Sequence, residues 1–471
     1  MLITLPEEFK KRMQSLLGDE YNRYVSSVSE FPPVKAFRVN TEKISVEEFE
    51  KINPYPSDKI PYVENGFYLR EYPIDTRYIK IRSEKGMLPK IGNHPFHHAG
   101  MIYSQDPSAM MPAECIDIKK DWKVLDMCAA PGGKSTQLKN KLGENGLLVS
   151  NEIISSRCKI LTGNIERLGL KNCITTCMDT NKLAKNFPDT FDLIMVDAPC
   201  SGEGMFRKEE QAVTEWSTEN VLKCAERQKN ILENAVTCLK DGGYIIYATC
   251  TFSLEENEMI IDEFLSSHPE FELVQVKKEV EDSTCDGIEF EGCKCKNINF
   301  ARRFYPHKAP GEGQFAAVLR STLTSASESK KKNTPDEKVD KLVFDFLDST
   351  LVSYDKSNVR MYNGNPVYYS GDLEIKKGVA FSCGVTIGEI KKNYIQPHHQ
   401  FFMAMGGHFK RKIELSPDSD EVINYLHGEE IDADTDNGWA VVTTCGCSLG
   451  GVKVSNKKGK NHYPKGLRLK Y

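Results

Sequence analysis

Val124-Leu-Asp-Met-Cys-Ala-Ala-Pro-Gly-Gly-Lys-Ser-Thr136 is the segment from which the fold can be worked out. Residues 123–127 form a short apolar run bounded by turn residues, which predicts a buried strand. Residues 128–133 are small, with a proline and two glycines, which indicates a tight loop. Residues 134–142 favour a helix. A strand, a small-residue loop and a helix open a nucleotide-binding βαβ unit, in which a ligand approaches the backbone closely.

The loop fits no common phosphate-binding motif. A P-loop would need a glycine where Cys128 stands, and the dinucleotide fingerprint G-x-G-x-x-G is absent. An ordinary strand–helix turn remains open as well. The next apolar run, 147–152, ends in Glu152, about 20 residues beyond Gly133, where an acid binds the ribose hydroxyls of an adenosine ligand. This acid favours a nucleotide site.

Composition limits the classes of protein that fit. The chain has 471 residues, 39% hydrophobic and 27% charged, which predicts a soluble protein of several domains. The net charge of −5 means that any surface for nucleic acid must be local. The sequence contains no apolar run long enough to span a membrane and no signal-peptide core near Met1. Fifteen cysteines without such a signal favour reduced thiols and a cytoplasmic location.

The chain divides into five predicted parts. Residues 1–100 form a small α/β extension that starts with a helix, and 101–320 alternate strands with helices, which predicts a parallel sheet covered on both faces. Residues 321–338 form a linker, 339–395 a small α/β unit, and 396–471 a mostly β region. Its tail, 451–471, holds seven Lys or Arg and no acid, which indicates a surface for a polyanion or a solvated basic tail.

Acids and thiols follow the predicted strands of the 101–320 core. Glu152, Asp179 and Asp197 end three strands, and ligands of open α/β sheets bind at this edge. Cys200 comes just after the strand that Asp197 ends, and Cys250 just after the next strand along the chain. We therefore expect both thiols at the same edge and not as small hydrophobic residues of the core. No metal site is expected, because the cysteines lack zinc-ligand spacing and His94, His97 and His98 are more typical of a loop or the surface.

The segment Arg302 to Phe315 permits two interpretations. It combines positive charge, aromatic residues and glycine, which suits backbone contacts and base stacking with single-stranded nucleic acid. It is equally compatible with a solvated loop before a last strand at 315–319.

These motifs together resemble the signature set of the Nol/Nop/Sun family of RNA 5-methylcytosine methyltransferases. The matching residues are Asp126 to Lys134, Asp197-Ala-Pro-Cys-Ser-Gly202, Ala248-Thr-Cys-Thr251 and Gln105-Asp-Pro-Ser108; Arg303 to His307, Gly311-Glu-Gly313 and Asn461 to Arg468 are similar to the bacterial ribosomal RNA branch. The resemblance implies a Rossmann-like catalytic domain at 101–320, an RNA-binding N-terminal extension and a PUA-like RNA-binding β-barrel region at 396–471. It also implies S-adenosylmethionine as cofactor.

The resemblance assigns roles to residues. The loop would hold the amino-acid and ribose portions of S-adenosylmethionine, Glu152 the ribose hydroxyls and Asp179 the adenine, while Asp197 would lie between cofactor and target base. The implied cofactor-binding residues are Cys128, Ala129, Ala130, Pro131, Gly132, Gly133, Lys134, Glu152, Asp179 and Asp197.

Carbon 5 of cytosine is a poor nucleophile, and a thiolate that adds to carbon 6 activates it. In this family the Thr-Cys thiol attacks, which is Cys250 here, and the Pro-Cys thiol, Cys200, assists release. Asp197 would bond the N3/N4 edge of the base. Lys134 would fix Asp197 and favour the thiolate. The base must be unstacked or single-stranded to expose carbon 6.

The expected substrate is small-subunit ribosomal RNA, and the expected state is a monomer without membrane association. Transfer RNA is the alternative substrate. A non-catalytic RNA-binding protein on the same fold, a methyltransferase for exocyclic amines and a P-loop ATPase are the competing classes. The intact loop and the two thiols count against the non-catalytic protein. An amine methyltransferase needs no thiol and has an aromatic residue after Pro-Pro where this chain has Pro199-Cys200-Ser201. The missing glycine at position 128 counts against the P-loop ATPase.

Overall fold

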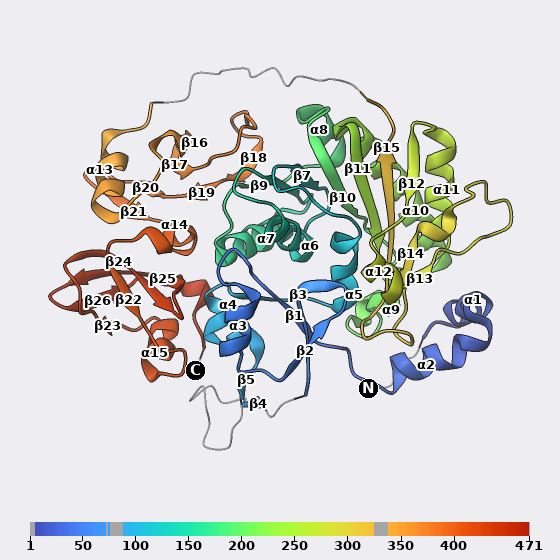
Figure 1. The fold of residues 1–471 in the computed structure, drawn as a ribbon, viewed down its shortest axis with the longest axis horizontal. Coiled ribbons are helices and arrows are strands. Elements are labelled where there is room, and N and C mark those ends of the chain that lie inside the picture. The colour runs from blue at the N-terminus through green and yellow to red at the C-terminus, as the bar shows by residue number, and fades with distance from the viewer. Residues whose placement is uncertain (1–4, 72–73, 76–87, 325–337, 471) are drawn as a thin grey trace.

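The computed structural model describes residues 5–71, 74–75, 88–324 and 338–470. Most of the predicted linker, residues 325–337, therefore lies outside the described residues. Figure 1 shows the small N-terminal sheet below the central sheet and the C-terminal region at the left, next to both of them. Within the described ranges, no helix has the length and apolarity that a lipid bilayer would require.

The N-terminal region consists of a helix pair and a small sheet. The helices are α1 (Glu7–Leu17) and α2 (Tyr21–Ser29), where the sequence predicted helix. Antiparallel strands follow in the order β2 (Ser57–Ile60), β3 (Val63–Leu69), β1 (Ala36–Val39) and β6 (Ile102–Ser104). Helix α3 (Val46–Ile52) begins at a capping box between Ser45 and Glu48, and the short α4 (Pro95–His98) precedes β6. Two-residue strands β4 (Ile74–Asp75) and β5 (Leu88–Pro89) pair beside this sheet.

The central sheet has five parallel strands, as the alternating pattern predicted. Their order is β11 (Leu239–Thr249), β10 (Phe191–Asp197), β7 (Lys123–Asp126), β8 (Leu147–Asn151) and β9 (Cys173–Thr176). Antiparallel strands extend both edges: β15 (Gln314–Ser321), β14 (Arg302–Phe304), β13 (Cys285–Asp286) and β12 (Phe271–Val274) beyond β11, and β18 (Ala380–Cys383) beyond β9.

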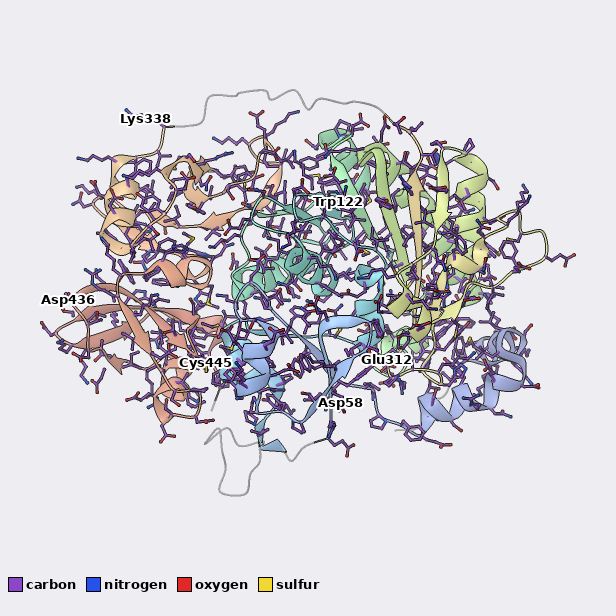
Figure 2. The ribbon with its side chains drawn as sticks, viewed as in Figure 1. Asp58, Trp122, Glu312, Lys338, Asp436 and Cys445 are labelled. Carbon is purple, nitrogen blue, oxygen red and sulfur yellow. The ribbon has the colours of Figure 1, made fainter. Side chains whose placement is uncertain are left out.

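Helices cover both faces of this sheet, because its buried strands are apolar on both sides. Leu125, Val149 and Ile194 pack toward α8 (Thr180–Asn186), α10 (Thr218–Cys238) and α11 (Glu258–Ser267). The alternating positions Val124 and Leu148 pack toward α6 (Gly133–Lys141) and α7 (Ser155–Leu168). Short helices α5 (Pro107–Met110), α9 (Glu210–Glu215) and α12 (Lys278–Ser283) join the strands at the edges. Trp122, before β7, lies near one end of the sheet, and Glu312 lies near the other (Figure 2).

The C-terminal region packs against the central sheet and the N-terminal region. It contains α13 (Lys341–Thr350), the sheet β16 (Val359–Tyr362), β17 (Asn365–Tyr368) and β19 (Val385–Thr386), and the pair β20 (Gly388–Ile390) and β21 (Ile395–Pro397). After α14 (His399–Met405) comes a five-stranded sheet of β22 (Lys412–Glu414), β24 (Gly438–Thr444), β25 (Cys447–Ser455), β26 (Lys458–Asn461) and β23 (Ile431–Asp432), with α15 (Asp420–His427). Because β18 joins the central sheet, the predicted 339–395 unit shares a sheet with the core.

The N- and C-terminal regions share one hydrophobic cluster, to which Phe37 and Phe67 contribute from one side and Val442 and Tyr463 from the other. At this interface the Nδ1 atom of His98 lies 2.7 Å from the hydroxyl of Tyr463. The expectation that His94, His97 and His98 lie in a loop or at the surface is therefore wrong. His94 and His98 are buried, and half-buried His97 lies in helix α4. They belong to α4 and its N-cap, where the side chain of His94 accepts from the Phe96 amide.

Candidate active site

The two sequence-predicted thiols lie side by side at the carboxyl edge of the sheet. Strands β10 and β11 pair in parallel with Asp197 opposite Ala248, and the Ala198 amide donates to the Ala248 carbonyl at 2.8 Å. The loops that follow bring the Sγ atoms of Cys200 and Cys250 to 3.2 Å from each other. Both side chains are half-buried, so a ligand can reach them.

A glycine allows the two loops to approach. The Gly204 amide donates to the Cys250 carbonyl at 2.8 Å. A Cβ atom on residue 204 would lie 2.8 Å from that same oxygen, closer than van der Waals contact allows. The absence of a side chain at Gly204 is therefore part of what sets the position of the Cys250 loop.

Lys134 and Asp197 form an ion pair beside the thiols. The Lys134 Nζ atom lies 2.8 Å from Oδ2 of Asp197, and Lys134 is buried in the first turn of α6. Burial lowers the pKa of Lys134, but the attraction of Asp197 outweighs it, with smaller contributions from Cys250 and Asp126, and the pKa is raised. The ammonium group therefore stays charged and interacts with Cys250 as well as with Asp197.

Backbone contacts fix the loop between β7 and α6. The Ala129 amide donates to the Asn151 carbonyl at 2.8 Å, and Arg157 and Asn164 donate to the carbonyls of Ala130 and Pro131, each at 3.0 Å. Gly132, the N-cap of α6, has a φ of 112°, a conformation that L side chains rarely adopt. The loop thus presents backbone and the N-terminus of α6 toward the edge of the sheet.

The residues around this loop fit an adenosine ligand with an amino-acid tail. Glu152 is buried at the end of β8, where its Oε1 accepts from the Ile154 amide at 2.9 Å and its Oε2 lies 3.3 Å from Arg157. Asp126 is fully buried, and its Oδ1 makes no hydrogen bond to any described residue. Burial raises the pKa of Asp126 to about 7. An unsatisfied carboxylate oxygen beside a small-residue loop suits a ligand that brings its own donor.

Asp179 has a structural partner. It is the N-cap of α8, and its Oδ1 accepts from the Lys182 amide at 3.0 Å. That hydrogen bond holds the pKa of Asp179 below its ordinary value. Asp179 thus lies just beyond the carboxyl end of β9, at the same edge of the sheet as Glu152, and it also caps helix α8.

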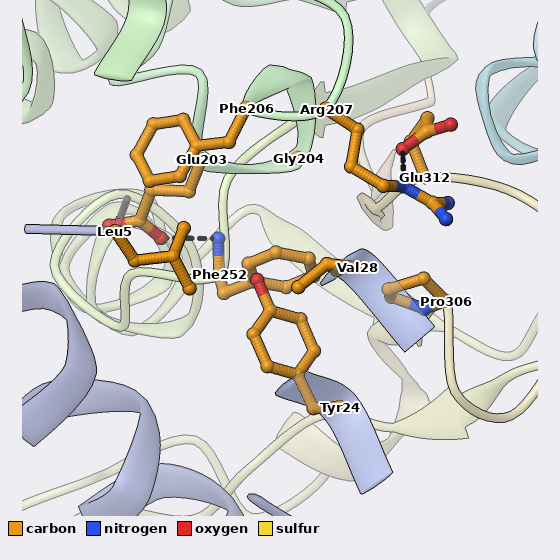
Figure 3. A pocket seen from close by; sticks show the side chains of 10 residues that line it. All are labelled: Leu5, Tyr24, Val28, Glu203, Gly204, Phe206, Arg207, Phe252, Pro306 and Glu312. Atoms are coloured by element: carbon orange, nitrogen blue, oxygen red, sulfur yellow. Dashed lines mark hydrogen bonds and ion pairs between the residues drawn. The ribbon is translucent and has the colours of Figure 1, made fainter. Parts of the chain in front are cut away.

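Several supporting residues were not predicted from the sequence. Glu203 accepts from the Phe252 amide at 2.8 Å and from Trp216 at 2.9 Å, and Figure 3 shows the first of these bonds in the pocket beside α2. Arg303 donates to the Phe252 carbonyl at 2.8 Å and forms a buried pair with Glu258. The peptide groups of Phe252, two residues after Cys250, are therefore held from both sides.

Both interpretations of residues 302–315 were wrong at Arg302 and Arg303. These residues form the buried strand β14, and Arg303 is only 1% exposed. A pair of arginines between aromatic residues resembles a surface segment, and no local pattern reveals an acid 45 residues away that neutralises one of them. The residues support the site and do not offer a face to nucleic acid.

The N-terminal region also contacts the loop. Arg38 in β1 is 1% exposed, and its Nη2 donates to the Gly133 carbonyl and to Thr136, each at 2.8 Å. Its Nε donates to Gln105 at 2.7 Å. Near α2, Arg207 pairs with Glu312 at 2.6 Å and donates to the Ser27 carbonyl at 2.9 Å (Figure 3). The contacts of this region with the site were not predicted from the sequence, because they join residues that are distant in the chain.

A doubly wound sheet with this loop and paired thiols at its carboxyl edge defines a Rossmann-like methyltransferase. Three family models match the chain: "16S rRNA methyltransferase RsmB/F" at residues 113–320, "N-terminal domain of 16S rRNA methyltransferase RsmF" at 5–107 and "Methyltransferase RsmF PUA domain" at 412–469. The ribosomal RNA small subunit methyltransferase F of Vibrio vulnificus is 30% identical over 487 residues, which cover 99% of this chain and 98% of that one. That of Erwinia tasmaniensis is 34% identical, over 68% of this chain and 64% of its own.

Among solved structures, a methyltransferase homolog from Pyrococcus horikoshii is 28% identical with a TM-score of 0.56, and covers 67% of this chain and 95% of its own. NSun6 from the same organism, solved with SFG, shares the fold at 24% identity and a TM-score of 0.55, over 68% of this chain and 99% of its own. The chain belongs to the RsmB/F family of S-adenosylmethionine-dependent ribosomal RNA methyltransferases. The fold class, the enzyme class and the cofactor that the sequence indicated are confirmed.

Proposed function

We propose that the protein methylates carbon 5 of cytosine in small-subunit ribosomal RNA through a covalent bond between Cys250 and the base. The observation that carries this proposal is the pair of sulfur atoms 3.2 Å apart beside the Lys134–Asp197 ion pair. A methyltransferase for exocyclic amines has no use for two adjacent thiols, whereas addition to carbon 6 followed by elimination needs a nucleophile and a group that assists its release.

The cofactor, when bound, would supply an electrophilic methyl group on its sulfonium sulfur and would be left as a neutral thioether after the transfer. The Cys250 thiolate adds to carbon 6 of cytosine, the electron pair moves to carbon 5, and Asp197 bonds the N3/N4 edge to stabilise the charge that appears there. Carbon 5 forms its bond to the methyl group, the carbon 5 proton passes to a base, and the sulfur–carbon bond breaks to return the Cys250 thiolate. The hydrogen bond with Cys250, and burial, hold the pKa of Cys200 well above its ordinary value, so Cys200 begins the cycle as a thiol and assists release.

The residues assigned to the cofactor remain the loop 128–134 for its amino-acid and ribose portions, Glu152 for the ribose hydroxyls and Asp179 for the adenine side. The orphan oxygen of Asp126 adds one candidate acceptor. The domain boundaries, the monomeric state and the cytoplasmic location remain predictions. Small-subunit ribosomal RNA is preferred over transfer RNA because the relatives named above act, by name, on that RNA.

Bisulfite sequencing tests the proposal. Small-subunit ribosomal RNA and transfer RNA from cells without the gene are compared with the same RNAs from cells that carry the wild-type gene or Cys250→Ala. We expect one or more cytosines to resist conversion only with the wild-type gene. Resistance confined to transfer RNA, or equal resistance with Cys250→Ala, would contradict the proposal.

A further inference from the structure

A buried carboxylate next to the thiol loops has no role in the chemistry described above. Glu256 is 0% exposed. Its Oε2 accepts from the Ser201 amide at 2.9 Å and from Gln228 at 2.8 Å, and its Oε1 accepts from the Ser201 hydroxyl at 2.5 Å. Burial of a carboxylate is costly unless its oxygens are hydrogen-bonded, so three donors directed at one acid form a specific arrangement.

These bonds connect the two loops that carry the thiols. Ser201 follows Cys200, Thr251 follows Cys250, and their hydroxyl oxygens lie 2.9 Å apart. Gln228 on α10 also donates to the Pro199 carbonyl at 3.1 Å, on the other side of Cys200. Glu256 lies in the Cys250 loop itself, between β11 and α11. It thus holds the Cys200 loop against its own loop, directly through Ser201 and indirectly through Gln228.

Such a connection is needed because the sheet does not extend to the sulfur atoms. The pairing of β10 with β11 ends at Asp197 and Ala248, and both cysteines lie beyond it. Both thiols must nevertheless meet one pyrimidine ring, and a displacement of about 1 Å in an active site can cost about 100-fold in rate.

We propose that Glu256 is a positioning residue, which holds the Cys200 loop against the Cys250 loop so that both thiols face the same base. The inference rests on the proposed function, because it assumes that both thiols act on cytosine.

Burial raises the pKa of Glu256 to about 7, against the bonds from Ser201 and Gln228 that lower it. The nearby carboxylate of Glu203 raises it further. The other titratable or charged groups that interact with Glu256 are Arg12 on α1, the Cys200 thiol, Cys224 on α10 and Tyr247 on β11. Arg12 forms its ion pair with Glu255. A protonated Glu256 loses one acceptor, so the contact between the loops weakens as the pH falls through about 7.

The test is Glu256→Gln in the full-length protein, which keeps the side-chain volume. Phenylarsine oxide, which bridges two adjacent thiols, reports on their separation without any methyl transfer. We expect capture by the arsenical to slow about tenfold and kcat to fall about 100-fold, with KM for RNA nearly unchanged. The acid limb of the pH profile of kcat should lose the ionisation of Glu256. Ser201→Ala, which removes only the hydroxyl link, should shift each quantity in the same direction by less.

Asp262→Asn is the matched control. Asp262 is a largely buried carboxylate whose Oδ1 accepts from the amides of Lys294 and Cys295, each at 2.7 Å, away from the thiol loops. Asp262→Asn should leave the rate of arsenical capture and the pH profile of kcat at wild-type values. Cofactor binding checks the folding of all variants. Wild-type capture rate and pH profile in Glu256→Gln would overturn the inference. Methylation by Cys250→Ala would instead overturn the proposed function, because arsenical capture does not depend on it.

Discussion

The side chains that carry out the chemistry follow the ends of two strands or lie in the first turn of one helix. Each of them contacts or interacts with another member of the group. Cys250 lies near the ammonium of Lys134, which Asp197 holds at 2.8 Å. Cys200 lies against Cys250. Removal of any one of these groups should therefore alter a definite part of the reaction while the fold remains.

Cys250→Ala should abolish methyl transfer, because it removes the nucleophile that adds to carbon 6, and should leave cofactor affinity within about twofold. Transfer of a labelled methyl group to RNA, together with equilibrium binding of S-adenosylmethionine, measures both quantities. Retained transfer would mean that the nucleophile has been assigned wrongly.

Lys134→Met should lower activity between pH 6 and 9 by about tenfold or more, because Asp197 and the thiolate that adds to carbon 6 both lose their neighbouring cation. The measurement is kcat between pH 6 and 9. Lys139→Met is the matched control: Lys139 is a buried lysine on the same helix, paired with Glu42 at 2.8 Å, and its substitution should leave the profile unchanged. An unchanged profile in Lys134→Met would contradict the role of Lys134.

At the scale of elements, the parallel strands and their helices could be predicted from the sequence because apolar runs and helical spacing are local signals. The loop and both thiols could be predicted because they lie next to those strands. Strands β14 and β18 could not, since each is short and is defined only by pairing with β15 or β9, far away in the chain. For the same reason Arg38, Glu256 and Arg303 were missed: their partners are distant in sequence.

Strand β14 supports the Cys250 loop through a buried ion pair. Arg303→Met should lower the free energy of unfolding by about 3–5 kcal/mol, because it leaves the carboxylate of Glu258 buried and unpaired. The measurement is urea-induced unfolding. Exposed Arg70, which pairs with Asp58 at the surface, is the control, and Arg70→Met should cost less than about 1 kcal/mol. Equal effects of the two substitutions would contradict a supporting role for β14.

At the scale of the molecule, the N-terminal region, the central sheet and the C-terminal region pack as one body. One hydrophobic cluster joins the two terminal regions, and β18 joins the C-terminal region to the sheet. The sequence suggested separable domains because linkers and composition mark boundaries, whereas the packing between domains leaves no local pattern. Deletion of 396–471 would therefore expose apolar surface, and RNA binding is better tested by substitution.

Buried His94 and His98 and half-buried His399 predict acid sensitivity. Burial lowers the pKa of His94 and His399 to about 3 and that of His98 to about 4, whereas the unfolded chain binds these protons near pH 6.5. The contribution of these neutral histidines to the free energy of unfolding is therefore complete above about pH 6.5. As the pH falls, the free energy of unfolding decreases by up to about 1.4 kcal/mol per pH unit for each histidine. Urea unfolding between pH 7.5 and 4.5 measures this slope. His399→Gln should reduce it, and an identical slope would contradict the interpretation.

The basic C-terminal tail is partly neutralised within the fold. Lys457 pairs with Asp434 and Lys458 with Asp432, whereas Lys460 and Lys465 form no ion pair within the part of the chain described. Lys460→Gln with Lys465→Gln should weaken RNA binding and reduce the salt dependence by about one unit of slope for each phosphate that the protein ceases to neutralise. The pair Lys457→Gln and Lys458→Gln should change the slope less. Filter binding from 50 to 300 mM salt measures the slope for both double variants. Equal slopes would mean that the tail is a solvated surface and does not bind RNA.

The covalent bond between protein and base is the most direct test of the mechanism. Cys200→Ala is incubated with S-adenosylmethionine and small-subunit ribosomal RNA, and the denatured complex is digested and mapped by mass spectrometry. We expect a methylated cytosine bonded to the sulfur of Cys250, because release is impaired while attack is not. An adduct that forms in Cys250→Ala and maps to Cys200, or no adduct in either variant while the wild-type protein methylates the RNA, would contradict the account.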